Sequence, residues 1–238
     1  FLAVTQGVVP DFGIIAETTD FGVTWIECGM CFFKVTVEGE TVYGPRHQRP
    51  EDPLDYNAHP NALVKMMPVV NAIEQRGREY SKKYQWRSRS GDIVVTPNVT
   101  LGALRAGLPH RPSLTANKAM LYIDVRLTPG QSPRAVEREL REVVDATGIK
   151  GVSVECFWYR PGYEGEGTEP LVDAISKAYT SLTNQPLPPV NPHETSMWRD
   201  LNVLNGLGIP AVTYGPRRIA DENGVKYMPV NDLVLAAK

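Results

Sequence analysis

The order in which the hydrophobic pattern changes between residues 24 and 158 constrains the fold more than any other feature of this sequence. Residues 33–39, FKVTVEG, alternate apolar and polar side chains, which predicts a strand with one solvated face. Residues 61–84 place apolar side chains at helical spacing, and Pro68 is expected to kink or shorten the start of that helix. The elements expected next are a strand at 92–104, a strand at 119–127, a helix at 132–148 and a strand at 152–158. This βαββαβ order predicts an antiparallel sheet with both helices on one face.

The segments on either side of this unit have a different character. Residues 1–23 and 159–238 contain short apolar runs, loops rich in proline and glycine, and an amphipathic helix at 171–182. Such a mixture is typical of α/β folds. We therefore expect an α/β domain in two segments, 1–23 and 159–238, interrupted by an inserted domain at 24–158.

Composition excludes several classes of protein. The chain has 238 residues, of which 42% are hydrophobic and 22% charged, so it is expected to bury a core. A net charge of −2 gives no electrostatic basis for binding nucleic acid. No apolar run reaches the roughly 18 residues that span a membrane. The N-terminal stretch FLAVTQGVVPDFG lacks a basic head and an initiator Met, so we expect no signal peptide, and either an interior piece of a longer chain or a start at the first ordered residue after a gap.

The three cysteines do not predict a disulfide framework. Cys28 and Cys31 form a C-x-x-C pair, but in a strand this spacing places them on opposite faces. No second pair and no nearby histidine completes a zinc site. Buried free thiols in a reducing cytoplasm are the favoured interpretation.

One acidic residue stands out near the start of the chain. The stretch Ile14-Ile15-Ala16-Glu17 is an apolar run that ends on a carboxylate. A buried strand delivers an acid to the edge of a sheet in this way, and binding sites are built at such edges. Glu17 is therefore a candidate site residue, and the alternative is a helix-capping or loop acid at a strand end.

Four stretches, in order along the chain, resemble one family of enzymes. They are IIAETT, VTVEGETVYG, LYIDVRLTPGQSP, and GLGIPAVTYGP followed by YMPVNDL. The family is that of the metal-dependent exopeptidases and deacylases, which contains acetylornithine deacetylase, succinyl-diaminopimelate desuccinylase, carboxypeptidase G and aminoacylase. The likeness spans nearly the whole chain, but only about the second half of a family member. It implies that 1–23 and 159–238 are catalytic-domain segments with a mixed sheet and flanking helices, and that 24–158 is a lid or dimerisation domain.

The resemblance implies one or two divalent metal ions, usually zinc, with manganese or cobalt as alternatives. Such ions polarise an amide carbonyl and lower the pKa of a bound water. Glu17 matches a metal-ligating acid of the family, and an ungapped match puts Glu222 where the family has its last histidine ligand. Glu222 is equally interpretable as a solvated loop acid. The other ligands and the general base match nothing in these 238 residues, so we expect this chain alone to be incomplete and inactive.

The resemblance also implies a catalytic donor in the lid. Family members carry a histidine there that reaches the partner subunit's site, and Tyr43 matches that position. A tyrosine hydroxyl donates the same kind of hydrogen bond but carries no positive charge at neutral pH. His47 is the alternative donor, and Tyr43 as a packing residue is the third possibility. His59 and His110, which stand beside prolines in loops, are interpreted as structural.

The stretch HETSMWRD, 193–200, matches a loop beside the family's site. Trp198, Arg199 and Asp200 are candidate substrate-binding residues, because an arginine and a tryptophan together clamp a carboxylate and a flat group. Arg217 is a further candidate, for an acidic substrate. A surface loop and an exposed basic side chain are the alternatives.

These features lead to three hypotheses for the parent protein. The first is a metal-dependent hydrolase of an amide-type C–N bond in an N-acyl amino acid, a small peptide or a related small acid, with removal of an amine from a non-peptide substrate as a variant. The second is a degenerate member used for binding or assembly. The third is a split protein whose other half is a second chain. A homodimer or higher homo-oligomer is expected through 24–158, with 31–37 as the lid's edge strand.

Overall fold

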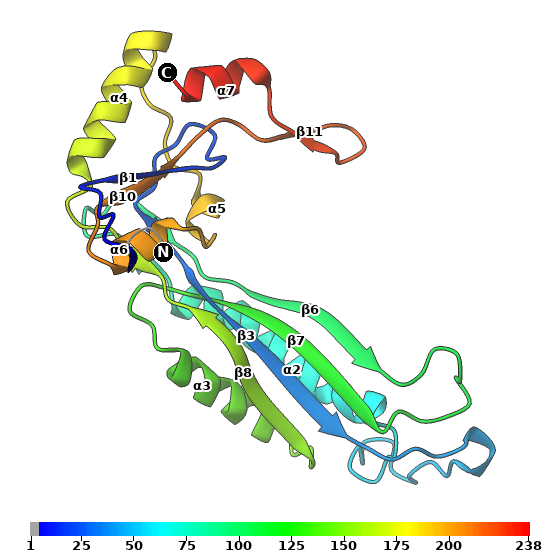
Figure 1. The fold of residues 1–238 in the computed structure, drawn as a ribbon. Helices are drawn as coiled ribbons and strands as arrows, with labels where there is room; N and C mark the ends of the chain where they lie inside the picture. Colours follow the sequence, from blue (N-terminus) through cyan, green and yellow to red (C-terminus); the bar gives the residue numbers. More distant parts are fainter. Residues whose placement is uncertain (1–4) are drawn as a thin grey trace.

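The structure is a computed structural model that describes residues 5–238. The first four residues of the predicted segment 1–23 lie outside the described residues. The chain forms a long domain built on one antiparallel sheet, called the lid below (residues 29–160), and a smaller region at one end of it, called the base (residues 5–27 and 163–238) (Figure 1). The exact boundaries proposed at residues 24 and 158 stay predictions.

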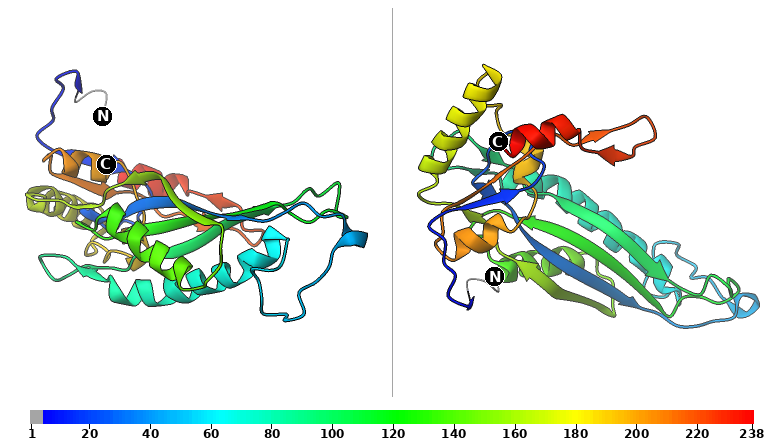
Figure 2. Two further views of the ribbon diagram at one scale, coloured as in Figure 1. Left: turned by 90° about the horizontal axis from the view of Figure 1, so that it is seen from below. Right: turned by 45° about the horizontal axis from the view of Figure 1, so that its top comes forward.

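The lid sheet has four antiparallel strands in the order β6-β7-β3-β8. Helices α2 and α3 both cover the same face of this sheet (Figure 2). The predicted βαββαβ order and the one-sided helices are therefore confirmed. The elements are β3 (Gly29–Glu38), α2 (Ala62–Lys83), β6 (Val99–Ala106), β7 (Lys118–Leu127), α3 (Pro133–Asp145) and β8 (Val152–Arg160).

The alternation of side chains in the central strands explains the lid core. Successive residues of a strand point to opposite faces, so every second residue of β3 and β7 meets the helices. These residues are buried together with the apolar stripes of α2 and α3. The buried strand residues are Cys31, Phe33, Val35, Val37, Leu121, Ile123, Val125 and Leu127.

One prediction about the lid is wrong. Residues 31–37 do not form an edge strand, because β3 pairs with β7 on one side and with β8 on the other. The apolar character of β3 comes from its central position. The two edges of the sheet are β6 and β8.

Helix α2 starts where the sequence predicts it, but Pro68 does not shorten it. The side chain of Asn61 accepts a hydrogen bond from the backbone N–H of Leu63 and so caps the first turn. The helix then continues through Pro68 to Lys83. A proline inside a helix removes one backbone hydrogen bond. The burial of Met66 and its neighbours against the sheet offsets that loss.

The base is built around β1 (Gly13–Ala16) and β10 (Ala211–Tyr214), which pair in parallel. β1 is less buried than predicted: Ile14 is 52% exposed, because among the described residues β1 pairs only with β10. Figure 1 shows the helices and a hairpin arranged around this pair. They are α4 (Glu169–Thr183), α5 (Pro192–Thr195), α6 (Leu201–Gly206), β11 (Ile219–Ala220), β12 (Lys226–Tyr227) and α7 (Val230–Ala236).

Short strand pairs join the lid to the base. β2 (Ile26–Glu27) pairs with β9 (Tyr163–Glu164), and β4 (Trp86–Arg87) pairs with β5 (Val94–Val95). The indole N–H of Trp86 and the backbone N–H of Arg89 both donate to the carboxylate of Glu164. These two hydrogen bonds attach the β4–β5 hairpin to β9, the strand that leads back into the base.

The cysteines are free thiols, as predicted. Cys28 packs with Ile26, Ile93 and Val95, whereas Cys31 lies in the lid core, so the two do face opposite sides. None of the helices in residues 5–238 combines the length and the apolar character that crossing a bilayer requires.

Candidate functional site around Arg199

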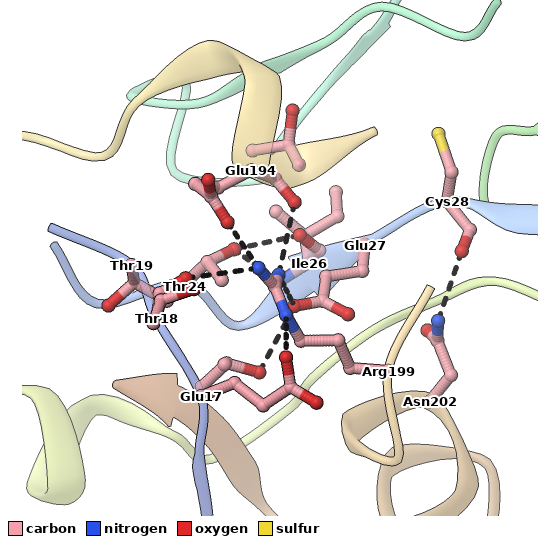
Figure 3. Close-up of polar contacts among 12 residues, drawn as sticks. Glu17, Thr18, Thr19, Thr24, Ile26, Glu27, Cys28, Glu194, Arg199 and Asn202 are labelled. Atoms are coloured by element: carbon pink, nitrogen blue, oxygen red, sulfur yellow. Dashed lines mark hydrogen bonds and ion pairs between the residues drawn. The ribbon is translucent and has the colours of Figure 1, made fainter. Parts of the chain in front are cut away.

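Arg199 lies in the loop between α5 and α6, and its guanidinium group is buried in the base. Its Nε donates to Glu17 Oε2 at 3.2 Å, and one terminal nitrogen donates to Glu27 Oε1 at 2.8 Å and to the Glu194 carbonyl at 3.4 Å. The other terminal nitrogen donates to the Thr18 carbonyl at 3.2 Å and to Glu194 Oε2. A guanidinium group has five N–H donors. All five are therefore used within the protein (Figure 3).

Three carboxylates converge on this one cation from different elements. Glu17 directly follows β1, Glu27 lies in β2, and Glu194 lies in α5. If every carboxyl group were ionised, the cluster would carry two negative charges in excess. The Glu17 side chain is 54% exposed, so solvent screens its charge, whereas Glu27 is completely buried.

Glu27 is the most unusual member of the cluster. Its Oε1 accepts hydrogen bonds from Arg199 and from the hydroxyl of Thr213, but its buried Oε2 has no partner among the described residues. Burial raises the pKa of Glu27 to about 7, although the charge and hydrogen bonds of Arg199 oppose this. A proton on Glu27 removes one of the excess negative charges.

A tight turn after β1 places Glu17 beside Arg199. The hydroxyl of Thr19 accepts from the backbone N–H of Gly215 at 3.0 Å, which ties the end of β1 to the end of β10. A Cβ atom on Gly215 would lie 2.1 Å from the Glu17 carbonyl oxygen. Only glycine permits this close approach. The turn at Gly215 and Pro216, directly after β10, therefore helps to position Glu17.

The two predicted metal ligands are not brought into one ligand group. Glu222 lies in the exposed turn of the β11–β12 hairpin, which projects away from β1 in Figure 1. Across residues 5–238 no three His, Cys, Asp or Glu side chains are arranged so that they could hold a metal ion, and the three carboxylates at Arg199 surround a guanidinium instead. The Arg199 guanidinium already donates a hydrogen bond to one carboxylate oxygen of Glu17. The residues of this chain alone therefore do not fit a metal ion, and the metal-ligand roles of Glu17 and Glu222 stay predictions.

The predicted substrate-binding residues separate into two groups. Trp198 and Asp200 line a cavity of about 650 Å³ between β1, α6 and the end of β8, together with Ile15, Arg160, Tyr163 and Leu204. Arg199 points the other way and has no N–H group left for a substrate. Arg217 makes a two-pronged ion pair with Asp232 at 2.7 and 2.9 Å. Substrate binding by these four residues stays a prediction.

The predicted lid donors lie at the end of the lid far from the base (Figure 1). Tyr43 is 52% exposed and precedes the short helix η1 (Gly44–Arg46). His47 follows η1 and turns inward, with its ring 4.9 Å from that of His59 and its Nε2 buried without a partner in residues 5–238. His59 Nδ1 accepts from the backbone N–H of Asn61, which fits its predicted structural role. Of the two candidate donors, Tyr43 is the one that a second molecule can reach.

Sequence reasoning missed Glu27 and Glu194. A signal existed for Glu27, since a charged residue inside the apolar run TWIECGMC is unusual in a buried strand. Glu194 lies five residues before Arg199 in the stretch already selected, but nothing in its spacing shows that the two side chains meet. Their pairing depends on how α5 folds back over β2.

Comparisons with known proteins agree with this architecture. Residues 55–152 match the peptidase dimerisation domain of the M20 family. The uncharacterized protein YgeY of Escherichia coli K12 is 21% identical over 225 residues, which cover 89% of this chain and 51% of that protein. The chain therefore spans about half the length of the curated relatives it matches.

Solved structures show a similar fold. A tripeptidase from Staphylococcus aureus matches with a TM-score of 0.61 at 16% identity, over 98% of this chain and 56% of that one. An M20 family metallo-carboxypeptidase from Sulfolobus solfataricus matches with a TM-score of 0.64 at 14% identity, over 98% and 62%. The chain thus has a mixed α/β fold that combines an M20-type dimerisation domain with part of an M20-type catalytic-domain fold.

Proposed function

We propose that the protein containing this chain is a metal-dependent hydrolase of an amide-type C–N bond. The proposed substrates are N-acyl amino acids, small peptides or related small acids. The observation that carries the proposal is the combination of a dimerisation-type lid with a parallel β1–β10 pair whose strand end presents Glu17. The tripeptidase and the carboxypeptidase with similar folds support the same reaction class.

Within that reaction this chain supplies positioning and enclosure. A bound metal ion would polarise the substrate carbonyl, but its ligands would have to include residues other than those described here. Arg199 fixes the orientation of Glu17 through Nε. The cavity beside Trp198 and Asp200 has mainly apolar walls with charged groups at Asp200 and Arg160, which suits a small acid with an apolar part.

The lid is proposed to pair with a second copy of itself. β8 is a poor candidate for this contact, because Arg141 donates to the Val154 carbonyl at 2.5 Å and so occupies its edge. β6 is the better candidate, since Leu104 on β6 and Met67 on the neighbouring helix α2 are both exposed apolar residues. Long apolar edge strands in native proteins are normally covered. In such a dimer Tyr43 would extend toward the partner's base.

A specific observation favours a second candidate function, a binding or assembly protein without catalysis. Arg199 occupies one carboxylate oxygen of Glu17, and the resemblance matches Glu222 and Tyr43 to positions where the family has histidines. One carboxylate occupied by arginine and two substituted histidines are what the loss of a metal site and of a lid donor would produce.

The two functions are separated by an assay of the complete protein. Metal content would be measured, and turnover of N-acetyl amino acids, dipeptides and tripeptides would be followed with and without a chelator. The hydrolase proposal expects turnover that a chelator abolishes and an added divalent metal restores. Absence of bound metal together with absence of turnover on every substrate would support the binding function.

A further inference from the structure

We propose that Arg199 is the resident cation of the Glu17–Glu27–Glu194 cluster, and that it excludes divalent metal ions from these three carboxylates. The inference concerns cation binding by this chain. It speaks against Glu17 as a metal ligand, and it leaves a metal-dependent hydrolase possible only through ligands other than these three carboxylates.

The first argument is the donor set around the guanidinium. The guanidinium donates its hydrogen bonds to carboxylate oxygens of Glu17, Glu27 and Glu194 and to backbone carbonyl oxygens of Thr18 and Glu194. Carboxylate and carbonyl oxygens are the ligands that Mg²⁺, Ca²⁺ and Mn²⁺ prefer. The guanidinium is therefore bound by the oxygen types that a hard metal ion prefers, although in residues 5–238 these side chains are not arranged to hold one while Arg199 is present.

The second argument is the charge and burial of Glu27. Its side chain is fully buried, and its Oε2 has no hydrogen-bond partner in residues 5–238. A buried carboxylate oxygen without a partner is costly, so the cluster depends on the positive charge of Arg199. While Arg199 is present, a divalent ion at Glu17 would lie close to an existing positive charge and be repelled by it.

These two arguments predict what removal of the cation does. Arg199→Ala leaves three carboxylates and two carbonyl oxygens around an empty space, with no positive charge. Such a group either takes up protons, loses its structure, or binds a metal ion. Mn²⁺ is the suitable probe, because it accepts an all-oxygen ligand set.

The test compares thermal unfolding of the 238-residue chain in a chelator and in millimolar MnCl₂. The parent should melt at the same temperature in both solutions. Arg199→Ala should melt at a lower temperature than the parent in the chelator, and MnCl₂ should raise its melting temperature by about 5–10 °C, as expected for a ligand present at roughly 100 times its Kd. Adding Glu17→Gln to that variant should reduce the gain.

Two matched variants separate a metal site from a general effect of salt. Arg199→Lys loses the forked hydrogen bonds but keeps a positive charge, so it should be destabilised without a gain from MnCl₂. Arg217→Ala removes a guanidinium that, in residues 5–238, forms its ion pair with the single carboxylate of Asp232, and it should not respond to Mn²⁺. Equal gains in all three variants would overturn the proposal.

The parent chain provides a second test if Arg199→Ala does not fold. Mn²⁺ binding to the parent and to Glu17→Gln would be measured by calorimetry. The proposal expects no Glu17-dependent binding. Stoichiometric binding to the parent that Glu17→Gln abolishes would overturn it, because the carboxylate would then be free for a metal while Arg199 is present.

Discussion

The lid and the base are stabilised by different means. The lid has one continuous apolar core between its sheet and its two helices, in which Phe33, Val35 and Met66 are fully buried. The base has only small apolar clusters, such as Val23 with Ile175 and Val212, and its most connected residue is the charged Arg199. None of the four residues of its strand β1 is fully buried.

This difference shows how the two regions should respond to change. Apolar burial is non-directional and tolerates small shifts in position, so the lid depends on the volume of its core. A buried polar cluster is stable only while each donor and acceptor keeps its partner. The base should therefore be sensitive to protonation and to single atoms, and the lid to the removal of large side chains.

The largest predicted effect contrasts an apolar residue of each region. Phe33→Ala removes a fully buried ring from β3 and should lower the free energy of unfolding by about 3–5 kcal/mol. Ile14→Ala in β1 removes a half-exposed side chain and should cost roughly 0.5 kcal/mol or less. Chemical denaturation of both variants measures the two values. Equal losses would remove the distinction between lid and base.

The second prediction concerns pH and the base. Burial raises the pKa of Glu27 from 4.5 to about 7, so the folded state holds this proton more tightly than the unfolded state does. The stability contributed by Glu27 is thus fully present below pH 4.5 and is lost as the pH rises through 7. The loss should be on the order of 3 kcal/mol.

Glu27→Gln is the matched variant, because it keeps the shape and removes the titrating group. Arg199, Glu17 and Glu194 face Glu27 and remain unchanged. Unfolding of the parent and the variant would be measured across this pH range. Parallel pH profiles would show that Glu27 does not hold the proton.

The third prediction concerns the exposed end of the lid. If Tyr43 stabilises an oxyanion in the partner's site, Tyr43→Phe in the complete protein should lower kcat about 100-fold and leave KM nearly unchanged. His47→Ala should then be nearly silent, since that ring faces His59. Steady-state kinetics distinguishes the cases: a loss confined to His47→Ala would transfer the role to His47, and two silent variants would favour the non-catalytic function.

The smallest predicted effect compares the two edges of the lid sheet. Leu104 on β6 and Phe157 on β8 are 46% and 47% exposed. Leu104→Lys should weaken a dimer through β6 by roughly tenfold or more, whereas Phe157→Lys should leave it intact. Light scattering across a concentration series measures both. A parent chain that stays monomeric at micromolar concentration, with its lid folded, would contradict the dimer itself.

The sequence predicts the lid well because periodicity is a local signal. The alternation in 33–39 and the helical spacing in 61–84 report burial directly, and both appear in the structure as expected. Strand order is not local. The apolar run 31–37 indicates a buried strand but does not distinguish a central strand from a covered edge, which is why β3 was misplaced.

The base and its site could be predicted only in part. The acid at the end of β1 is visible in the sequence, and Trp198, Arg199 and Asp200 are visible as an unusual cluster. That Arg199 turns toward Glu17, rather than into the cavity with Trp198 and Asp200, depends on packing between segments more than 170 residues apart. The partner of a buried charge is set by tertiary structure, and spacing along the chain does not reveal it.

Native-state hydrogen exchange tests the contrast between the two regions most directly. Backbone amides in regions that open only with global unfolding exchange slowest, and amides in locally opening regions exchange faster. We predict that the backbone amides of β3 and β7 exchange most slowly. The amides of β1 and β10 should exchange through local openings that cost less free energy than global unfolding, and these openings should become more frequent as the pH rises through 7. Amides in β1 and β10 as protected as those of β3 at every pH would contradict the account.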